Sequence, residues 1–252
     1  MIPVRFPPTT SGAVRAGVIV NFDSIHFVDM VALAGFDFVL LDAEHGPLTP
    51  SSAYGMIRAA NSHRLAVYVR TPGRDAHEIQ RYLDLGAHGI QAQVDNAAQA
   101  RQLCERVFYP PKGCRGLSLS TPAAAFGAGA TAAAYLHDFN AKASVFVTVE
   151  NRSALAEIEA IAATEHLTGV CIGTGDLALS LGVPGVRDAP EVVDAVSRIV
   201  NICRARGIEV LVPATDSASA RMSLELGVTG LQFPASVLVI EKGKQLLRDM
   251  RS

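Results

Sequence analysis

The hydrophobic residues of this 252-residue chain gather in short runs that recur along its length. The runs are apolar on both faces rather than alternating, which is typical of parallel strands covered by helices. We predict strands over residues 14–20, 37–42, 65–70, 88–93, 144–149, 168–172, 208–212 and 229–233.

Helical patterns of apolar residues fill the stretches between these runs. We predict helices over residues 75–85, 95–106, 151–164, 188–206 and 216–226. Several end at a glycine before the next strand, as in LDLGAHGI, RARGIEVL and LELGVTGL, and glycine is the residue that best tolerates the left-handed end of a helix. About eight strand–helix units without a linker predict an α/β fold, a (β/α)₈ TIM barrel forming one domain over residues 1–252. Residues 1–12 form a Pro-rich lead-in, and an open doubly wound sheet is the alternative fold.

The composition narrows the class of protein. The formal net charge is -2 with acids and bases mixed along the chain, which argues against nucleic acid or an anionic membrane as a partner. No stretch approaches the roughly 18 consecutive apolar residues of a membrane span, and MIPVRFPPTTSG lacks the apolar core of a signal peptide. The four cysteines form no CxxC pair, and Cys104, Cys171 and Cys203 sit in apolar surroundings. These features predict a cytoplasmic protein with reduced cysteines.

Polar residues stand where two of the predicted strands end. In FDFVLLDAEHGPLTP an apolar run leads directly into Asp42, Glu44 and His45, and Arg70 ends LAVYVR. The carboxyl ends of barrel strands meet at one mouth, where such enzymes carry their active sites. An arginine at a buried strand end needs an anion, and its planar fork suits a carboxylate or an enolate. His45 is the only histidine at a predicted strand end, whereas Asp84, at the end of a helix, could be solvated or could orient a histidine.

Two further carboxylates follow neighbouring strands. Glu150 ends SVFVTVE, and Asp176 lies in CIGTGDLALSLG. Together they could hold one divalent cation through hard oxygen ligands, which suits Mg²⁺ or Mn²⁺. Singly, each could instead be a helix N-cap or a first-turn acid favoured by the helix dipole. The GTGD turn would expose backbone N–H groups that favour an anion such as a substrate carboxylate.

One connection is unusually long for a barrel of this kind. The segment YPPKGCRGLSLSTPAAAFGAGATAAAYLHDFNAK lies between the fourth helix and the strand at 144–149 and is rich in Gly, Pro, Ser and Ala. A connection of this length is more typical of an active-site loop or lid than of a turn. Its AAAFGAGATAAAYL part predicts a helix of small residues.

Several of these segments together resemble one known family. The segments LLDAEHGP, YVRTPG, YPPKGCRG, VTVENRSALAEIEAIA and GVCIGTGDLALSLGVPG, with LDLGAHGI and LELGVTGL, are similar in order and spacing to the HpcH/HpaI aldolase family. Its members are class II, metal-dependent pyruvate aldolases. The resemblance implies a (β/α)₈ barrel and a homo-oligomer, usually a hexamer built from dimers that exchange the C-terminal helix.

The resemblance also implies a reaction and roles for residues. It implies a lyase that reversibly cleaves a 4-hydroxy-2-oxo acid into pyruvate and an aldehyde, with Mg²⁺, Mn²⁺ or Co²⁺ held by Glu150 and Asp176. Arg70 would stabilise the pyruvate enolate, and His45 with Asp84 would transfer the proton.

Other residues would support these groups. Asp42 and Glu44 would contact the metal-bound water and His45. The substrate would be bound by Arg70 and by Thr148, Gly173, Thr174 and Gly175, with Thr148 standing where the family usually has glutamine.

Two other functions remain alternatives. A CoA-ester lyase of the same superfamily should carry a cluster of basic residues for the CoA phosphates, and the sequence shows no such cluster. A catalytically silent barrel that binds a small oxo acid is the other alternative, because the loop at 117–129 and the last strand end depart from the family pattern. These departures also leave the acceptor aldehyde open.

Overall fold

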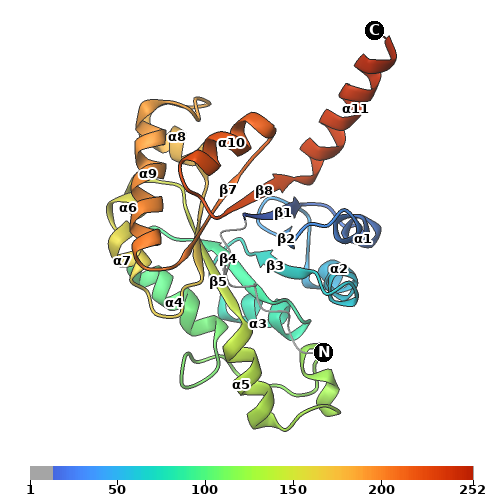
Figure 1. Cartoon of the computed structure of the whole chain (residues 1–252). Coiled ribbons are helices and arrows are strands. Elements are labelled where there is room, and N and C mark those ends of the chain that lie inside the picture. The colour runs from blue at the N-terminus through green and yellow to red at the C-terminus, as the bar shows by residue number, and fades with distance from the viewer. Residues whose placement is uncertain (1–13, 252) are drawn as a thin grey trace.

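Eight parallel strands close into a barrel in the computed structural model, which describes residues 14–251 (Figure 1). Neighbours around the barrel follow the order of the sequence, and β8 pairs with β1. The strands are β1 (Arg15–Val20), β2 (Phe38–Asp42), β3 (Ala66–Arg70), β4 (Gly89–Gln93), β5 (Ser144–Val149), β6 (Gly169–Ile172), β7 (Glu209–Pro213) and β8 (Gly230–Pro234). The predicted closed barrel is confirmed, and the open sheet is excluded. The predicted lead-in at residues 1–12 lies outside the described residues.

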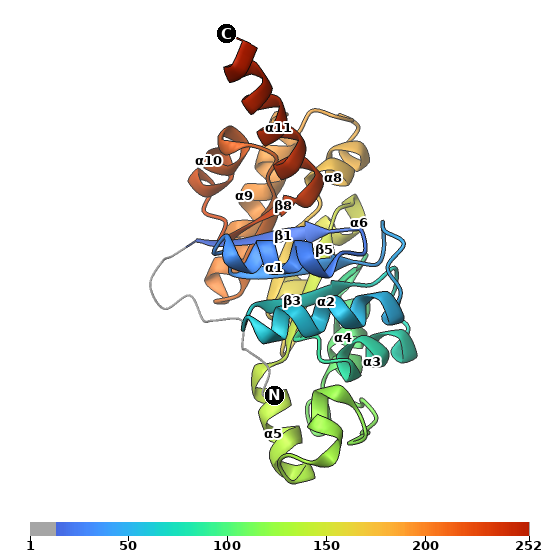
Figure 2. The same cartoon turned by 90° about the vertical axis from the view of Figure 1, so that its right-hand side faces the viewer.

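Helices surround the barrel in the connections between strands, and one more helix follows the last strand (Figures 1 and 2). They are α1 (Ile25–Leu33), α2 (Pro50–Ser62), α3 (Ala76–Asp84), α4 (Ala97–Val107), α5 (Ala132–Lys142), α6 (Arg152–Ala156), α7 (Ile158–Ala162), α8 (Thr174–Leu181), α9 (Pro190–Ala205), α10 (Ser217–Glu225) and α11 (Ala235–Arg251), with a 3₁₀ segment η1 (Pro122–Gly127). Many begin after a Ser, Thr, Asn or Asp whose side chain accepts a backbone N–H of the first turn, as Thr49 and Asp75 do. Within residues 14–251 no helix has the length and apolarity needed to cross a membrane.

The predicted helix at 151–164 is wrong in one respect, because it is broken into α6 and α7. Glu157 separates the two pieces with φ of -100° and ψ of 13°. Its carboxylate accepts the backbone N–H of Ala97, in the first turn of α4, at 3.0 Å. A negatively charged acceptor is favourable at a helix N-terminus, so the break places Glu157 where it stabilises a neighbouring helix.

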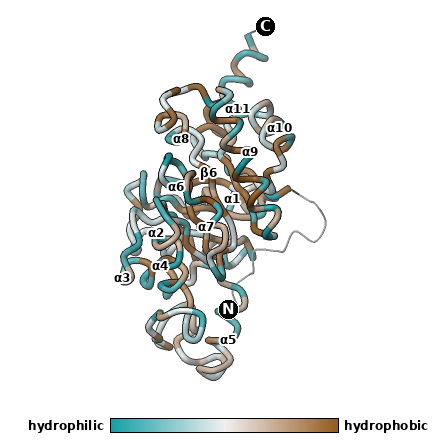
Figure 3. Tube along the Cα trace, turned by 90° about the vertical axis from the view of Figure 1, so that its left-hand side faces the viewer, coloured by the Kyte–Doolittle hydropathy of each residue, from teal (hydrophilic) through white to brown (hydrophobic). Residues whose placement is uncertain are grey.

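Apolar side chains form two layers of core. The larger layer lies between the strands and the helices, and Figure 3 shows hydrophobic stretches near β6 and hydrophilic ones on outer helices such as α3. The smaller layer fills the barrel itself, where Tyr68 packs edge-on against Phe38 and Phe146 with ring centroids 5.8 and 5.3 Å apart. The barrel is therefore a packed core rather than a pore, and its chemistry is confined to the mouth.

The last helix leaves the barrel. Figures 1 and 2 show α11 extending away from the other elements, and Ala235 at its start is its one buried residue among those described. Its exposed side chains include Val239, Ile240, Leu246, Leu247 and Met250. An apolar helix face of this kind is left uncovered by the single chain.

The long connection before β5 contains η1 and α5. The predicted small-residue helix is present only in part, because Ala125 and Phe126 in η1 have positive φ and α5 begins at Ala132. Figures 1 and 2 show this segment extending from the barrel on the side opposite α11. The segment contacts α3 through η1.

Candidate active site

Two charged side chains at adjacent strand ends form the base of the site. Asp42 ends β2 and Arg70 ends β3, and the two residues are register partners. Arg70 Nε donates to Asp42 Oδ1 at 2.9 Å, and Nη2 donates to Oδ2 at 2.5 Å. The side chains are only 16% and 3% exposed, so this two-point ion pair is shielded from water.

Arg70 is held as a permanent cation. Burial acts to lower its pKa, but the hydrogen bonds and charge of Asp42, followed by the charges of Glu44 and Glu150, raise the pKa overall. Asp42 occupies Nε and one hydrogen of Nη2. Within the described chain no hydrogen bond takes Nη1, which leaves this edge of the guanidinium for an anion.

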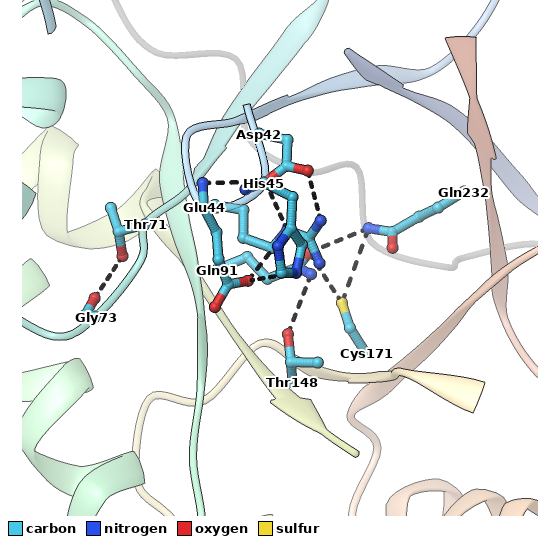
Figure 4. Close-up of polar contacts among 10 residues, drawn as sticks. Asp42, Glu44, His45, Thr71, Gly73, Gln91, Thr148, Cys171 and Gln232 are labelled. Atoms are coloured by element: carbon cyan, nitrogen blue, oxygen red, sulfur yellow. Dashed lines mark hydrogen bonds and ion pairs between the residues drawn. The ribbon is translucent and has the colours of Figure 1, made fainter. Parts of the chain in front are cut away.

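The turn after β2 carries Glu44 and His45 to the rim of the barrel (Figure 4). Asp42 Oδ1 accepts the backbone N–H groups of Glu44 and His45 at 3.1 and 3.2 Å, which fixes the start of the turn. Gly46 lets the turn close, because a Cβ there would lie 2.5 Å from the carbonyl oxygen of Asn21.

Glu44 lies between Arg70 and His45. Its Oε2 is 3.5 Å from Arg70 Nε and 3.7 Å from His45 Nε2. The imidazole side chain is 63% exposed and so can reach a bound molecule. The turn thus places a carboxylate beside the histidine and the arginine.

Glu150 and Asp176 lie close enough to influence each other's charge. Glu150 follows β5 and is half-buried, whereas Asp176 is exposed in the first turn of α8. Burial raises the pKa of Glu150, and the negative charges of Asp176 and Glu44 raise it further. Gly173 makes this packing possible, because a Cβ there would lie 2.5 Å from Glu150 Oε2.

These carboxylates suit a hard divalent cation. Like charges that repel one another in a half-buried site are relieved by a bound cation. Within residues 14–251 no group of three or more His, Cys, Asp or Glu side chains is arranged to hold a metal ion. Two carboxylates are nevertheless a sufficient protein contribution for Mg²⁺, which commonly keeps several waters and takes further oxygens from the substrate.

The first turn of α8 presents backbone donors beside these carboxylates. Gly173 is the N-cap residue, and no side chain caps the helix. The N–H groups of Thr174 and Gly175 belong to the helix turn that has no intrahelical partner. The turn predicted from GTGD is present, and its donors face the same mouth as Glu150.

Asp84 has a different partner. Its Oδ1 accepts from Arg115 Nη2 at 2.5 Å, and the Arg115 side chain is fully buried. The guanidinium carbon lies 4.6 Å from the ring centroids of Tyr109 and Phe139. Asp84 also lines a surface cavity of about 460 Å³ between α2, α3 and the segment before η1.

The structure therefore brings most of the predicted site together. The charges of Glu44, His45, Arg70 and Asp176 all act on Glu150, and Glu44 also lies beside His45 and Arg70. In the described single chain no contact joins Asp84 to His45, and the carboxylate beside the imidazole is that of Glu44. The orientation of His45 by Asp84 stays a prediction.

Beneath this cluster lies a buried polar network that the sequence did not indicate (Figure 4). Gln91 Nε2 donates to Thr148 Oγ1 at 3.2 Å. Gln91 Oε1 accepts from Cys171 Sγ at 3.1 Å and from Gln232 Nε2 at 3.1 Å. Burial raises the pKa of Cys171, which keeps it a thiol. Two features of the sequence could have indicated this network. They are the pattern QAQ at the end of β4 and the glutamine at position 232 in β8.

Comparison with known proteins matches the chain to one family and to aldolases within it. A family model described as HpcH/HpaI aldolase/citrate lyase matches residues 15–233. The chain is 34% identical over 222 residues to a 5-keto-4-deoxy-D-glucarate aldolase of Klebsiella pneumoniae, covering 88% of this chain and 86% of that protein. It is 34% identical over 218 residues to a hydroxypyruvate/pyruvate aldolase of Sagittula stellata, covering 86% and 85%.

A solved structure of similar fold also belongs to this family. It is the structure of an HpcH/HpaI aldolase/citrate lyase family protein from Burkholderia cenocepacia J2315. This structure superposes with a TM-score of 0.90 at 29% identity and covers 96% of both chains.

Proposed function

Because the chain belongs to the HpcH/HpaI aldolase/citrate lyase family, we propose that it reversibly cleaves a 4-hydroxy-2-oxo acid into pyruvate and an aldehyde. The two relatives described above are aldolases. Members of this family generally depend on a divalent metal ion. The observation that carries the proposal is the position of Glu150 at the barrel mouth, where the charges of Asp176, Glu44 and Arg70 all act on it.

Glu150 and Asp176 are the proposed metal ligands. Their oxygens suit Mg²⁺, Mn²⁺ or Co²⁺, and the raised pKa of Glu150 supports a bound cation as the relief of local repulsion. A bound metal ion would act as a Lewis acid that polarises the substrate carbonyl. The first turn of α8, with Gly173, Thr174 and Gly175, would bind the substrate carboxylate through backbone N–H groups.

Arg70 is the proposed stabiliser of the enolate. When the C3–C4 bond of the substrate breaks, its electron pair passes into the C2–C3 bond and negative charge develops on the C2 oxygen. Nη1 of Arg70 would donate to this oxygen, and Asp42 prevents the guanidinium from moving toward the charge. A donor fixed in advance favours the transition state without a reorganisation cost.

His45 is the proposed proton-transfer residue. It would take the proton of the C4 hydroxyl as the aldehyde forms, and a proton would then be delivered to C3 to give pyruvate. Glu44, at 3.7 Å, is positioned to stabilise the imidazolium that results. For Asp84 to orient His45, as predicted, its carboxylate would have to contact His45 as well as Arg115.

The chain is further proposed to work as a homo-oligomer. The support is α11, which leaves its own barrel and exposes Val239, Ile240 and Leu247 along one 17-residue helix. Such a surface is expected to pack against another copy, in a dimer-based assembly such as a hexamer. A monomer mass in light scattering at micromolar concentration would exclude it.

Pyruvate release from a panel of 4-hydroxy-2-oxo acids, with and without Mg²⁺, Mn²⁺ or Co²⁺, tests the proposed reaction. We expect release that stops on chelation and returns with metal, and that Glu150→Gln abolishes. Citramalyl- and malyl-CoA in the same assay test the CoA-ester alternative. Binding of pyruvate without turnover of any substrate would instead identify a silent oxo-acid-binding barrel.

A further inference from the structure

The network around Gln91 is a polar layer that lies directly above apolar side chains of the barrel. Gln91, Thr148, Cys171 and Gln232 are each no more than 4% exposed. Directly below them the barrel is filled by aromatic and aliphatic side chains. Buried polar groups cost stability unless they are bonded, and apolar residues could fill the same space. This layer is therefore a candidate for a role beyond packing.

The hydrogen bonds of this layer run in one direction in the structure, from Gln232 through Gln91 to Thr148. The Gln91 carbonyl has two lone pairs, and they accept from the Cys171 thiol and the Gln232 amide. The Gln91 amide nitrogen in turn donates to Thr148 Oγ1 at 3.2 Å.

This arrangement determines what the Thr148 hydroxyl can do. Because its oxygen accepts from Gln91, its own hydrogen must turn to another acceptor. Within residues 14–251 no group accepts that hydrogen. Thr148 thus remains a donor, polarised by the chain of bonds that begins at Gln232 and passes through Gln91.

The position of Thr148 points this donor at the site. Thr148 lies two residues before Glu150 on β5, on the same side of the strand. Its register partner on β6 is Cys171, which lies two residues before Gly173, the N-cap of α8. Thr148 therefore lies one step below both Glu150 and the start of α8, on the face of the strand that leads to the mouth.

We propose that Gln91 is a positioning residue that holds the Thr148 hydroxyl as a donor to the carboxylate of the bound 2-oxo acid. The inference rests on the proposed function, because that function identifies the ligand. A bond to the substrate carboxylate exists equally before and during C–C cleavage. Loss of Gln91 should therefore weaken binding and raise KM while leaving kcat nearly unchanged.

The test compares Gln91→Leu, Thr148→Val and the double variant, with Gln91→Met as a second near-isosteric variant should Gln91→Leu fail to fold. Gln102→Leu, at an exposed helix position, is the matched control. Calorimetry measures Kd for pyruvate with Mg²⁺-loaded protein, and Kd for Mg²⁺ is measured separately. KM and kcat are measured with any substrate that the wild type cleaves.

We expect Gln91→Leu and Thr148→Val each to raise the Kd for pyruvate about 10-fold, in line with a hydrogen bond to a charged group. The double variant should be no worse than Thr148→Val, and Thr148→Ser should retain wild-type binding. Affinity for Mg²⁺ and kcat should change less than about two-fold.

Wild-type Kd in both Gln91 variants would overturn the inference, as would fully additive losses in the double variant. The binding readout separates this inference from the proposed function. A wild type that binds pyruvate but cleaves nothing would refute the reaction, while the Kd of the Gln91 variants would still decide the positioning role.

Discussion

Arg70 and Asp42 are joined by two parallel hydrogen bonds, of 2.9 and 2.5 Å, across the ends of strands β3 and β2. The same Asp42 oxygen that accepts from Arg70 Nε also accepts the backbone N–H groups of Glu44 and His45. One buried carboxylate thus sets the direction of the guanidinium and the shape of the turn that carries the histidine. The geometry of the β2–β3 side of the mouth depends on it.

Replacement of this carboxylate should damage catalysis more than folding. Asp42→Asn removes the charge and one of the two acceptors, so Arg70 loses its fixed direction. We expect kcat/KM for aldol cleavage to fall about 10²-fold or more, by analogy with removal of a fixed oxyanion donor. The matched control is Asp37→Asn, just before the start of β2, where the carboxylate accepts the N–H of Ala16. Equal losses of activity in the two variants would contradict a specific role for Asp42.

Removal of His45 should slow proton transfer without disturbing the metal. His45→Ala should reduce kcat by about 10²–10⁴-fold, the usual contribution of general acid–base catalysis. Affinity for Mg²⁺, measured by calorimetry, should remain within about two-fold of wild type. Wild-type cleavage rates across neutral pH would show instead that the end of β2 is merely solvated.

Metal affinity should depend on pH through Glu150. Burial and the charges of Asp176 and Glu44 raise the pKa of Glu150, so its ligating form is lost on acidification at a higher pH than for an ordinary glutamate. Glu44→Gln removes one of these charges and should lower that pKa. The pH at which Mg²⁺ affinity falls on acidification, measured by titration at a series of pH values, should therefore be lower in this variant than in the wild type. If that pH is unchanged or higher, the charge of Glu44 does not act on Glu150 as described.

His88 should make the fold acid-sensitive. Burial lowers its pKa to about 4, and its Nδ1 accepts the N–H of Val67 at 3.0 Å. The unfolded chain, with a histidine pKa of about 6.5, then binds more protons than the folded chain between pH 6.5 and 4. The stability that neutral His88 provides is present in full above about pH 6.5. As the pH falls from about 6.5 to about 4, the free energy of unfolding decreases by up to about 3 kcal/mol because of this residue.

Urea unfolding at pH 7 and pH 5 measures this effect. His88→Gln should lose less unfolding free energy between the two pH values than wild type, whatever its stability at pH 7. The exposed His77→Gln should behave like wild type. An equal pH dependence in His88→Gln and wild type would rule out His88 as the source.

The strands were predictable because burial on both faces leaves continuous apolar runs. Every strand boundary lies within one residue of its prediction, and the topology then brings Asp42, Arg70 and Glu150 to one mouth. What the sequence could not show are pairings made by single side chains across long separations. Arg115 reaches Asp84 across 31 residues, and Gln91 reaches Thr148 across 57. Such contacts depend on side-chain direction within the packed barrel, which no local pattern encodes.

The central claim is that this mouth stabilises the enolate of pyruvate with a metal ion and Arg70. Proton NMR of pyruvate in D₂O tests it without knowledge of the acceptor aldehyde, because enolisation exchanges the methyl hydrogens for deuterium. With Mg²⁺ the wild type should catalyse this exchange, and both chelation and Arg70→Ala should abolish it. Exchange that continues at the wild-type rate after chelation, or in Arg70→Ala, would contradict the account.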